Sequence, residues 1–279
     1  MCQANAVPRA MRPCDAARYA AAQAAGVTRH TRGVRKLLAC GVLAGPLFVT
    51  AFLIEGATRP GYNALRHPIS SLAIGDLGWT QSANFLVAGL LTVAYALGVR
   101  RASGSTWGSL LIAASGVGFI GAAIFVTDPI SGYPPGTPDR LQYTQAGALH
   151  QLLSTLYFVG LPAACFVMAR KQRGGWAAYS VVSGLLFIVA FVLAAAGFGQ
   201  APGLVDFGGL FQRIAVIDGE LWLSLLAVYF LRETPSVPSS THSAASASAA
   251  GAKGGAGPTV LEMASHHRSG SDSASHTDP

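Results

Sequence analysis

The side chains best suited to catalysis or ligand binding lie between residues 66 and 220. They are Arg66 and His67, Asp76, Asp128, His150, and the group Arg213, Asp218 and Glu220. Histidine and carboxylate are ligand types for zinc, and a catalytic zinc ion usually has three protein ligands and one open position. One hypothesis is therefore a metal or acid–base site. Its metal candidates are His67, Asp76, Asp128 and His150, and its catalytic candidates are His67, Asp128 and His150.

The spacing of these residues does not itself define such a site. No His-x-x-x-His or similar local pair occurs, and His67 and Asp128 each precede a proline. A polar side chain at such a position commonly shapes a turn or a helix cap, which is the alternative interpretation. The sequence contains no phosphate-binding glycine loop, nucleophile elbow, Cys-x-x-Cys pair or haem-binding pattern. It therefore identifies neither a reaction nor a cofactor.

Arg213, Asp218 and Glu220 lie in or next to an apolar stretch and need a separate explanation. Arg213 and Glu220 are seven residues apart, which places them on nearly the same face of a helix. A charge near the middle of a bilayer costs roughly 2.5 to 3.5 kcal/mol on insertion scales. One explanation is an ion pair of Arg213 with Asp218, Glu220 or Asp128. The other is a polar cavity in which these groups, with Arg66, bind a ligand.

The elements that position these residues must be membrane-spanning helices, because the chain is too apolar for an ordinary soluble domain. Of its 279 residues, 51% are hydrophobic and only 11% are charged, whereas soluble domains have roughly 25% charged residues. A spanning helix needs about 20 mostly apolar residues. Such stretches lie at about residues 37–54, 79–99, 107–127, 147–169, 176–198 and 211–231. The sequence predicts an all-α, polytopic bundle of six transmembrane helices.

The distribution of basic residues predicts the orientation of this bundle. With both termini in the cytoplasm, all but four of the 19 lysine and arginine residues lie on the cytoplasmic side, the four being Arg59, Arg66, Arg140 and Arg213. Cytoplasmic segments of membrane proteins carry such an excess of positive charge. We therefore expect a multi-pass protein of the cell (inner) membrane, with most of the candidate residues near its outer face.

The two ends of the chain differ from the bundle in composition. Residues 1–36 are basic and residues 232–279 are rich in Ser, Ala and Gly, so both are predicted to be disordered tails of a transmembrane domain at residues 37–231. The net charge of +7 comes from short basic clusters beside apolar runs, which suit anionic lipid headgroups better than nucleic acid. The expected partners are the lipid bilayer and a lipid or small polar ligand, and no oligomeric state is predicted.

Short motifs around the candidate residues resemble those of a known family. They are Asn63 with Arg66-His67-Pro68-Ile69-Ser70-Ser71-Leu72, Gly78-Trp79 with Gln81 and Asn84-Phe85, Thr127-Asp128-Pro129, Gly147 with His150, and Gln212-Arg213 with Trp222. In these residues the chain resembles the uncharacterised, mainly bacterial family of multi-pass membrane proteins called domain of unknown function 998, over about residues 37–231. The resemblance implies the six-span fold and directs attention to the outer-face polar residues, but it implies no reaction.

Three functions are consistent with this sequence. The first is an enzyme or binding protein that handles a lipid headgroup or small polar molecule at the outer face through the histidines, Asp128, Arg213 and Glu220. The second is a small-solute or proton-coupled transporter in which Arg213, Asp218 and Glu220 line a path between helices. The third is a structural or assembly protein whose polar residues only hold helices together. The positions of these side chains in three dimensions discriminate between the three.

Overall fold

The computed structural model describes residues 13–234, and the predicted tails at residues 1–12 and 235–279 lie outside the described residues. Its helices are α1 (Pro13–Thr58), the short 3₁₀ helix η1 (Ile69–Ala73), α2 (Gly78–Ser103), α3 (Thr106–Ile124), α4 (Gln145–Ala169), α5 (Gly175–Phe198) and α6 (Gly208–Glu233). Six of them are long and apolar enough to cross a membrane. The predicted all-α bundle of six spans is confirmed.

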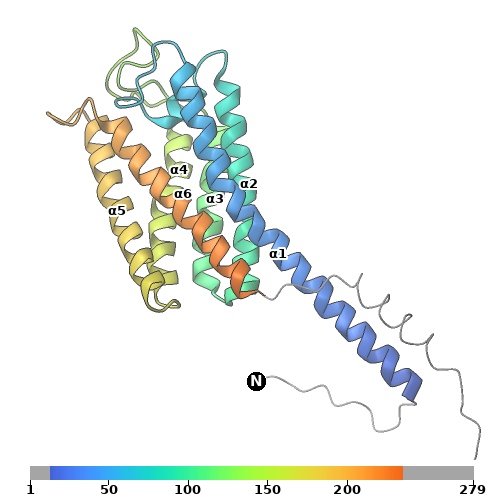
Figure 1. Ribbon diagram of the computed structural model, residues 1–279. Helices are drawn as coiled ribbons and strands as arrows, with labels where there is room; N and C mark the ends of the chain where they lie inside the picture. Colours follow the sequence, from blue (N-terminus) through green and yellow to red (C-terminus); the bar gives the residue numbers. More distant parts are fainter. Residues whose placement is uncertain (1–12, 235–279) are drawn as a thin grey trace, which may run out of the picture. The chain divides into compact units, whose positions relative to one another are not determined.

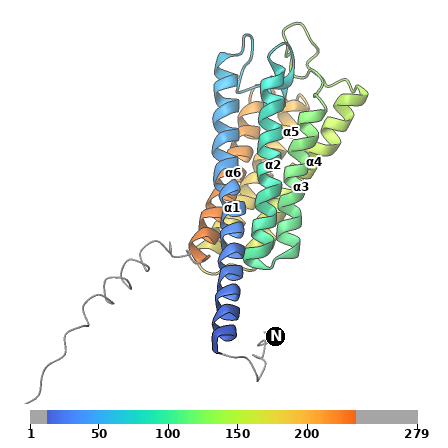
Figure 2. The same ribbon diagram turned by 90° about the vertical axis from the view of Figure 1, so that its right-hand side faces the viewer.

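The six long helices run side by side, alternately up and down (Figures 1 and 2). Neighbours in sequence pack together, and α1 also contacts α6, which closes the bundle. The three long connections, residues 59–77, 125–144 and 199–207, lie at one end, which we call the loop end. The two short connections, α2 to α3 and α4 to α5, lie at the opposite end, which we call the turn end.

The outward faces of the helices are apolar. Large side chains exposed on these faces include Leu47, Leu90, Leu152 and Val189. A soluble protein rarely exposes apolar surface on this scale, whereas lipid tails solvate it well. This surface and the six spans identify a multi-pass membrane protein.

The first helix is longer than the predicted span at residues 37–54. It begins at Pro13 and extends past the turn end of the bundle (Figure 2), so residues 13–36 are helical, not irregular as expected. The segment is rich in alanine, which has the highest helix propensity. Arg35 donates hydrogen bonds to the carbonyl oxygens of Leu231 (2.9 Å) and Thr234 (2.8 Å). Arg35 thereby caps the end of α6 and joins it to α1.

Glycines allow the helices to approach each other closely. A Cβ atom added at Gly89 of α2 would lie 2.7 Å from the carbonyl oxygen of Gly116 in α3, and one at Gly116 would lie 2.8 Å from that of Gly89. A Cβ atom at Gly45 of α1 would lie 2.7 Å from the carbonyl oxygen of Glu220 in α6. Since lipid tails are as apolar as the helices, such close packing is a main source of helix association in membranes.

Aromatic rings fill the interior of the bundle. Phe48 of α1, Phe119 of α3 and Tyr157 of α4 form a continuous row, with ring centroids 4.6 Å apart for Phe48 and Phe119 and 4.3 Å apart for Phe119 and Tyr157. Phe85 of α2 packs against Phe48 at 5.5 Å. This cluster ties four helices together and forms one side of the cavity described below.

Candidate functional site

The structure does not bring the four predicted metal ligands together in one group. Asp76 is exposed in the connection before α2, whereas His67, Asp128 and His150 are buried. Within residues 13–234, no group of three or more His, Cys, Asp and Glu side chains could hold one metal ion. The hypothesis of a metal site at these four residues is therefore not supported.

Two of the three catalytic candidates hold the backbone of the loop end. Nδ1 of His67 accepts a hydrogen bond from the backbone N–H of Asn63 (2.9 Å). The carboxylate of Asp128 accepts hydrogen bonds from the backbone N–H (2.8 Å) and the hydroxyl (2.6 Å) of Thr144, the N-cap of α4. Asp128 thus closes the 125–144 connection, and a Cβ atom at Gly147 would overlap its carboxylate.

His150 has a comparable role at the end of α3. Its Nδ1 lies 2.7 Å from the carbonyl oxygen of Phe125, the C-cap of α3. A carbonyl oxygen can only accept a hydrogen bond, so Nδ1 carries the proton. His67, Asp128 and His150 are therefore each used in a separate local contact, and the structure does not bring them together around one reacting group.

The environment of His67 is expected to make the stability of the protein depend on pH. Burial lowers the pKa of His67, and the positive charges of Arg66 and Arg213 lower it further, against an opposing backbone hydrogen bond with Ser131. The unfolded chain, with a histidine pKa of about 6.5, therefore takes up a proton at higher pH than the folded chain. Stability is expected to fall as the pH drops below about 6.5, because the unfolded state then binds more protons.

We expect the midpoint of thermal unfolding in detergent to fall between about pH 7.5 and about pH 5. In His67→Asn, which keeps a hydrogen-bond acceptor but cannot titrate, this fall should be smaller. His30→Asn is the matched control, because His30 is exposed. The same pH dependence in both variants would contradict the role assigned to His67.

Arg213 is buried among neutral partners. It is 7% exposed and donates hydrogen bonds to the carbonyl oxygens of His67 (3.1 Å) and Gly209 (3.0 Å) and to the hydroxyl of Tyr62. Its guanidinium also lies 6.0 Å from the ring centroid of Phe52 and 5.5 Å from that of Tyr62, within the range of cation–π attraction. Arg213 therefore joins α6 to the end of α1 and the connection that follows it.

The predicted ion pair of Arg213 with Asp218, Glu220 or Asp128 is wrong. The ion pairs found in residues 13–234 join Arg59 to Glu55 and Arg66 to Asp139 and Asp206. The reason is geometric. Arg213 points from α6 toward α1, whereas the two acids further along α6 point to other helices.

Asp218 and Glu220 leave α6 in different directions. Glu220 is 1% exposed and accepts a hydrogen bond from the hydroxyl of Tyr157 in α4 (3.1 Å), while its second oxygen has no partner. Asp218 lies beside Ser183 of α5. Residues two positions apart are separated by about 200° around a helix, so the two acids leave opposite sides of α6 and do not line one common path.

Arg66 ties the three long connections together. It donates hydrogen bonds to the carboxylates of Asp139 (2.8 Å) and Asp206 (3.1 Å) and to the carbonyl oxygen of Ser131 (3.1 Å). The predicted ligand-binding role of Arg66 is not tested by these contacts, but its donors are engaged by protein groups.

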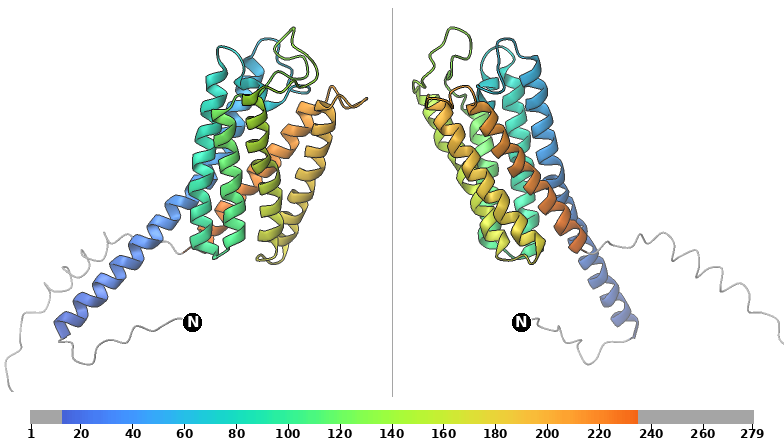
Figure 3. Two further views of the ribbon diagram at one scale, coloured as in Figure 1. Left: turned by 180° about the vertical axis from the view of Figure 1, so that it is seen from behind. Right: turned by 60° about the vertical axis from the view of Figure 1, so that its left-hand side comes forward.

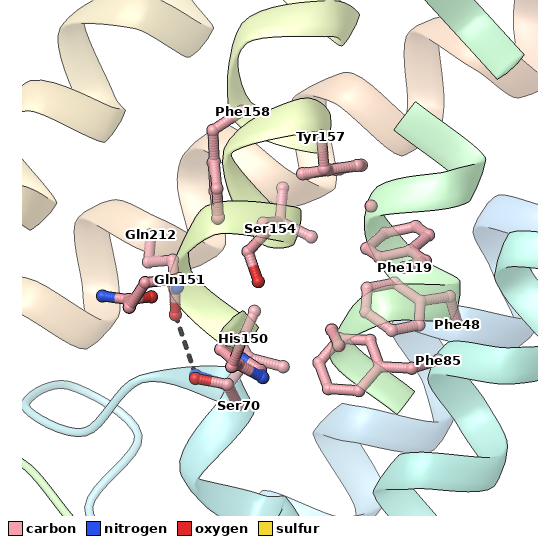
Figure 4. A pocket seen from close by; sticks show the side chains of 14 residues that line it. Phe48, Ser70, Phe85, Phe119, His150, Gln151, Ser154, Tyr157, Phe158 and Gln212 are labelled. Carbon is pink, nitrogen blue, oxygen red and sulfur yellow. Dashed lines mark hydrogen bonds between the residues drawn. The ribbon is translucent and has the colours of Figure 1, made fainter. Parts of the chain in front are cut away.

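A cavity lies between α4 and α6, next to η1, and we call it the internal cavity (Figure 4). Its volume is about 50 Å³. One wall is polar (Ser70, Gln151, Ser154 and Gln212) and the other is aromatic (Phe48, Phe85 and Phe119). The side-chain oxygen of Gln212 accepts a hydrogen bond from the backbone N–H of Ile69 (2.8 Å). The hydroxyl of Ser154, which is 9% exposed, has no partner.

A larger groove of about 620 Å³ adjoins the internal cavity, and we call it the α4/α5 groove. The two helices diverge toward the loop end, as Figures 1 and 3 show. Phe158 and Phe191 form part of its wall as stacked rings, with centroids 4.2 Å apart. Five residues line both spaces, namely Ser70, Gln151, Ser154, Phe158 and Gln212.

Sequence reasoning missed most of this lining. His150, Ser154 and Tyr157 recur at helical spacing in α4, next to Gln151, and Gln212 and Val216 are four residues apart in α6. A search for polar residues at intervals of three or four within predicted spans would have found the stripe in α4. Only His150 among these residues has the metal affinity that drew attention in the sequence.

The comparisons with known proteins give a family but no function. A model of the family DUF998, described as protein of unknown function, matches residues 42–229. This range contains every residue that lines the internal cavity and the α4/α5 groove. No curated protein and no solved structure matches the chain.

Proposed function

The chain belongs to the DUF998 family of proteins of unknown function, and we propose that it binds a lipid at the outer face of the cell membrane, in the α4/α5 groove. The observation that carries this proposal is the groove itself. Its volume of about 620 Å³ is in the range of small-molecule binding sites. It lies between two spanning helices, so its walls adjoin the lipid that surrounds the bundle.

The lining of the groove is apolar in one part and polar in another, as the binding of a lipid requires. Phe158, Phe191 and Ala195 form an apolar part between α4 and α5, where an acyl chain could lie. Gln151 and Gln212 provide hydrogen-bonding groups closer to the start of α4 and of α6. With both termini in the cytoplasm, as the basic residues predict, this polar part faces the outer membrane surface. A lipid of the outer leaflet could then enter sideways between the two helices.

Transport has less support. Asp218 faces α5 and Glu220 faces α4, whereas Arg213 points toward the end of α1. These three charged groups therefore do not form one continuous line between the two ends of the bundle. Catalysis has no observation in its favour either, since His67, Asp128 and His150 each serve a local contact. We therefore propose binding and no reaction.

The test is to fill the groove. Ala195 of α5 lines the groove and is exposed, so tryptophan at this position would occupy the space of an acyl chain. Steric overlap of this kind costs about 1 to 3 kcal/mol, and we expect Ala195→Trp to weaken lipid binding about tenfold or more. The measurement is labelling of the purified protein in nanodiscs by a phospholipid with a photoreactive acyl chain, mapped by peptide mass spectrometry.

Ala83→Trp is the matched control. Ala83 is also an exposed alanine near the loop end, but it belongs to α2 and does not line the groove. Labelling of α4 and α5 peptides lining the groove should be lost in Ala195→Trp and kept in Ala83→Trp. Equal labelling of these peptides in both variants would overturn the proposal.

A further inference from the structure

We propose that the lipid in the α4/α5 groove carries a phosphate group, which Arg140 binds at the mouth of the groove. This inference rests on the proposed function and narrows it to one class of lipid. Arg140 is the one charged residue among those that line the groove. A phosphate group is the anionic part of a phospholipid and the group that a guanidinium recognises best.

Arg140 is available for such a ligand. It is exposed, and it takes part in none of the ion pairs found in residues 13–234. The neighbouring carboxylate of Asp139 is already engaged by Arg66, at 2.8 Å. The acid closest in sequence therefore has another partner, and the guanidinium of Arg140 can bind an anion from outside the protein.

The backbone that carries Arg140 is held on both sides. The carbonyl oxygen of Asp139 accepts hydrogen bonds from the backbone N–H of Ser131 (2.8 Å) and the side chain of Gln200 (3.3 Å). On the other side, Asp128 holds the N–H and the hydroxyl of Thr144. Holding the backbone reduces the ordering entropy that binding costs.

The groups deeper in the groove fit the next part of a phospholipid. The side-chain oxygen of Gln212 is used by Ile69, so its NH₂ group is what remains to meet a ligand. The hydroxyl of Ser154 is buried, has no partner, and lies on the same shared wall. Both groups can donate to the carbonyl oxygen of an acyl ester. Arg140 would then bind the phosphate, Gln212 and Ser154 the acyl ester, and Phe158 the acyl chain.

The experiment compares two lipids that differ only in the headgroup phosphate. Delipidated full-length protein in detergent is titrated with palmitoyl-oleoyl phosphatidic acid and with palmitoyl-oleoyl glycerol, and bound lipid is counted by native mass spectrometry. Hydrogen bonds between charged groups are roughly twice as strong as those between neutral groups, so we expect the phospholipid to bind about tenfold more tightly or better. Arg140→Gln should abolish this preference and leave binding of palmitoyl-oleoyl glycerol unchanged.

Arg101→Gln is the matched control, because Arg101 is an exposed arginine at the turn end. It should keep the preference. If Arg140→Gln keeps it too, or if Arg101→Gln loses it, the assignment of Arg140 is overturned while lipid binding stands. If glycerol phosphate displaces the phospholipid completely at equal concentration, the site recognises free phosphate and not a lipid. If neither lipid binds the wild-type protein, the proposed function itself fails.

Discussion

Arg213→Met is expected to destabilise the folded protein by about 2 to 4 kcal/mol, because the substitution removes three hydrogen bonds that a buried charged group donates. Their acceptors are the carbonyl oxygens of His67 and Gly209 and the hydroxyl oxygen of Tyr62. Methionine is similar to arginine in length and fills much of the same space, so the loss comes mainly from the hydrogen bonds and not from a cavity. The measurement is the free energy of unfolding in mixed micelles of mild detergent and dodecyl sulfate.

Two further variants make this result interpretable. Arg213→Lys keeps the positive charge but cannot present the planar guanidinium to several acceptors at once, so its stability should lie between those of the wild type and Arg213→Met. Arg101→Met removes an exposed arginine and should change stability by less than about 0.5 kcal/mol. If Arg213→Met is as stable as Arg101→Met, the buried contacts of Arg213 do not stabilise the fold.

The same substitution, glycine to alanine, is expected to have opposite effects at two positions. In Gly116→Ala the new Cβ atom would lie 2.8 Å from the carbonyl oxygen of Gly89 and 3.0 Å from the backbone nitrogen of Val93. Backbone atoms cannot turn aside as a flexible side chain can, so α2 and α3 must separate. Overpacking of this kind typically costs about 1 to 3 kcal/mol.

Gly33→Ala is the matched control in the extension of α1. A Cβ atom there would meet nothing within 4 Å, and alanine is more favourable than glycine in a helix by about 1 kcal/mol. The variant should therefore be at least as stable as the wild type, whereas Gly116→Ala should unfold at a clearly lower temperature. Equal midpoints for the two variants would show that α2 and α3 are not held at contact distance by glycine.

The spans could be predicted from the sequence because their cause is local. A run of about 20 apolar residues is stable in a membrane only as a helix, since each backbone hydrogen bond must then be made within the segment. The fifth helix, for example, was expected at residues 176–198 and is found at Gly175–Phe198. The extension of α1 could not be predicted in this way, because it lies outside the apolar run. It is helical because alanine has a high helix propensity, and not because lipid surrounds it.

The partners of the candidate residues could not be predicted, because they are distant in sequence. Arg213 contacts Tyr62, 151 residues away, and Glu220 contacts Tyr157, 63 residues away. The number of residues between two positions of a helix gives the angle between their side chains. Which neighbouring helix each side chain faces depends on how the bundle packs. For this reason the expected ion pair of Arg213 was wrong.

The sequence by itself thus determined that this chain is a six-helix membrane protein with its polar residues gathered toward one end. Tertiary structure alone decided that His67, Asp128 and His150 serve separate contacts and that α4 and α5 diverge to form a groove. The physical reason is that hydrophobicity acts on each segment separately, whereas a binding site requires side chains from several segments to converge. That convergence is set by contacts between helices, such as those of Gly89 with Gly116 and of Phe158 with Phe191.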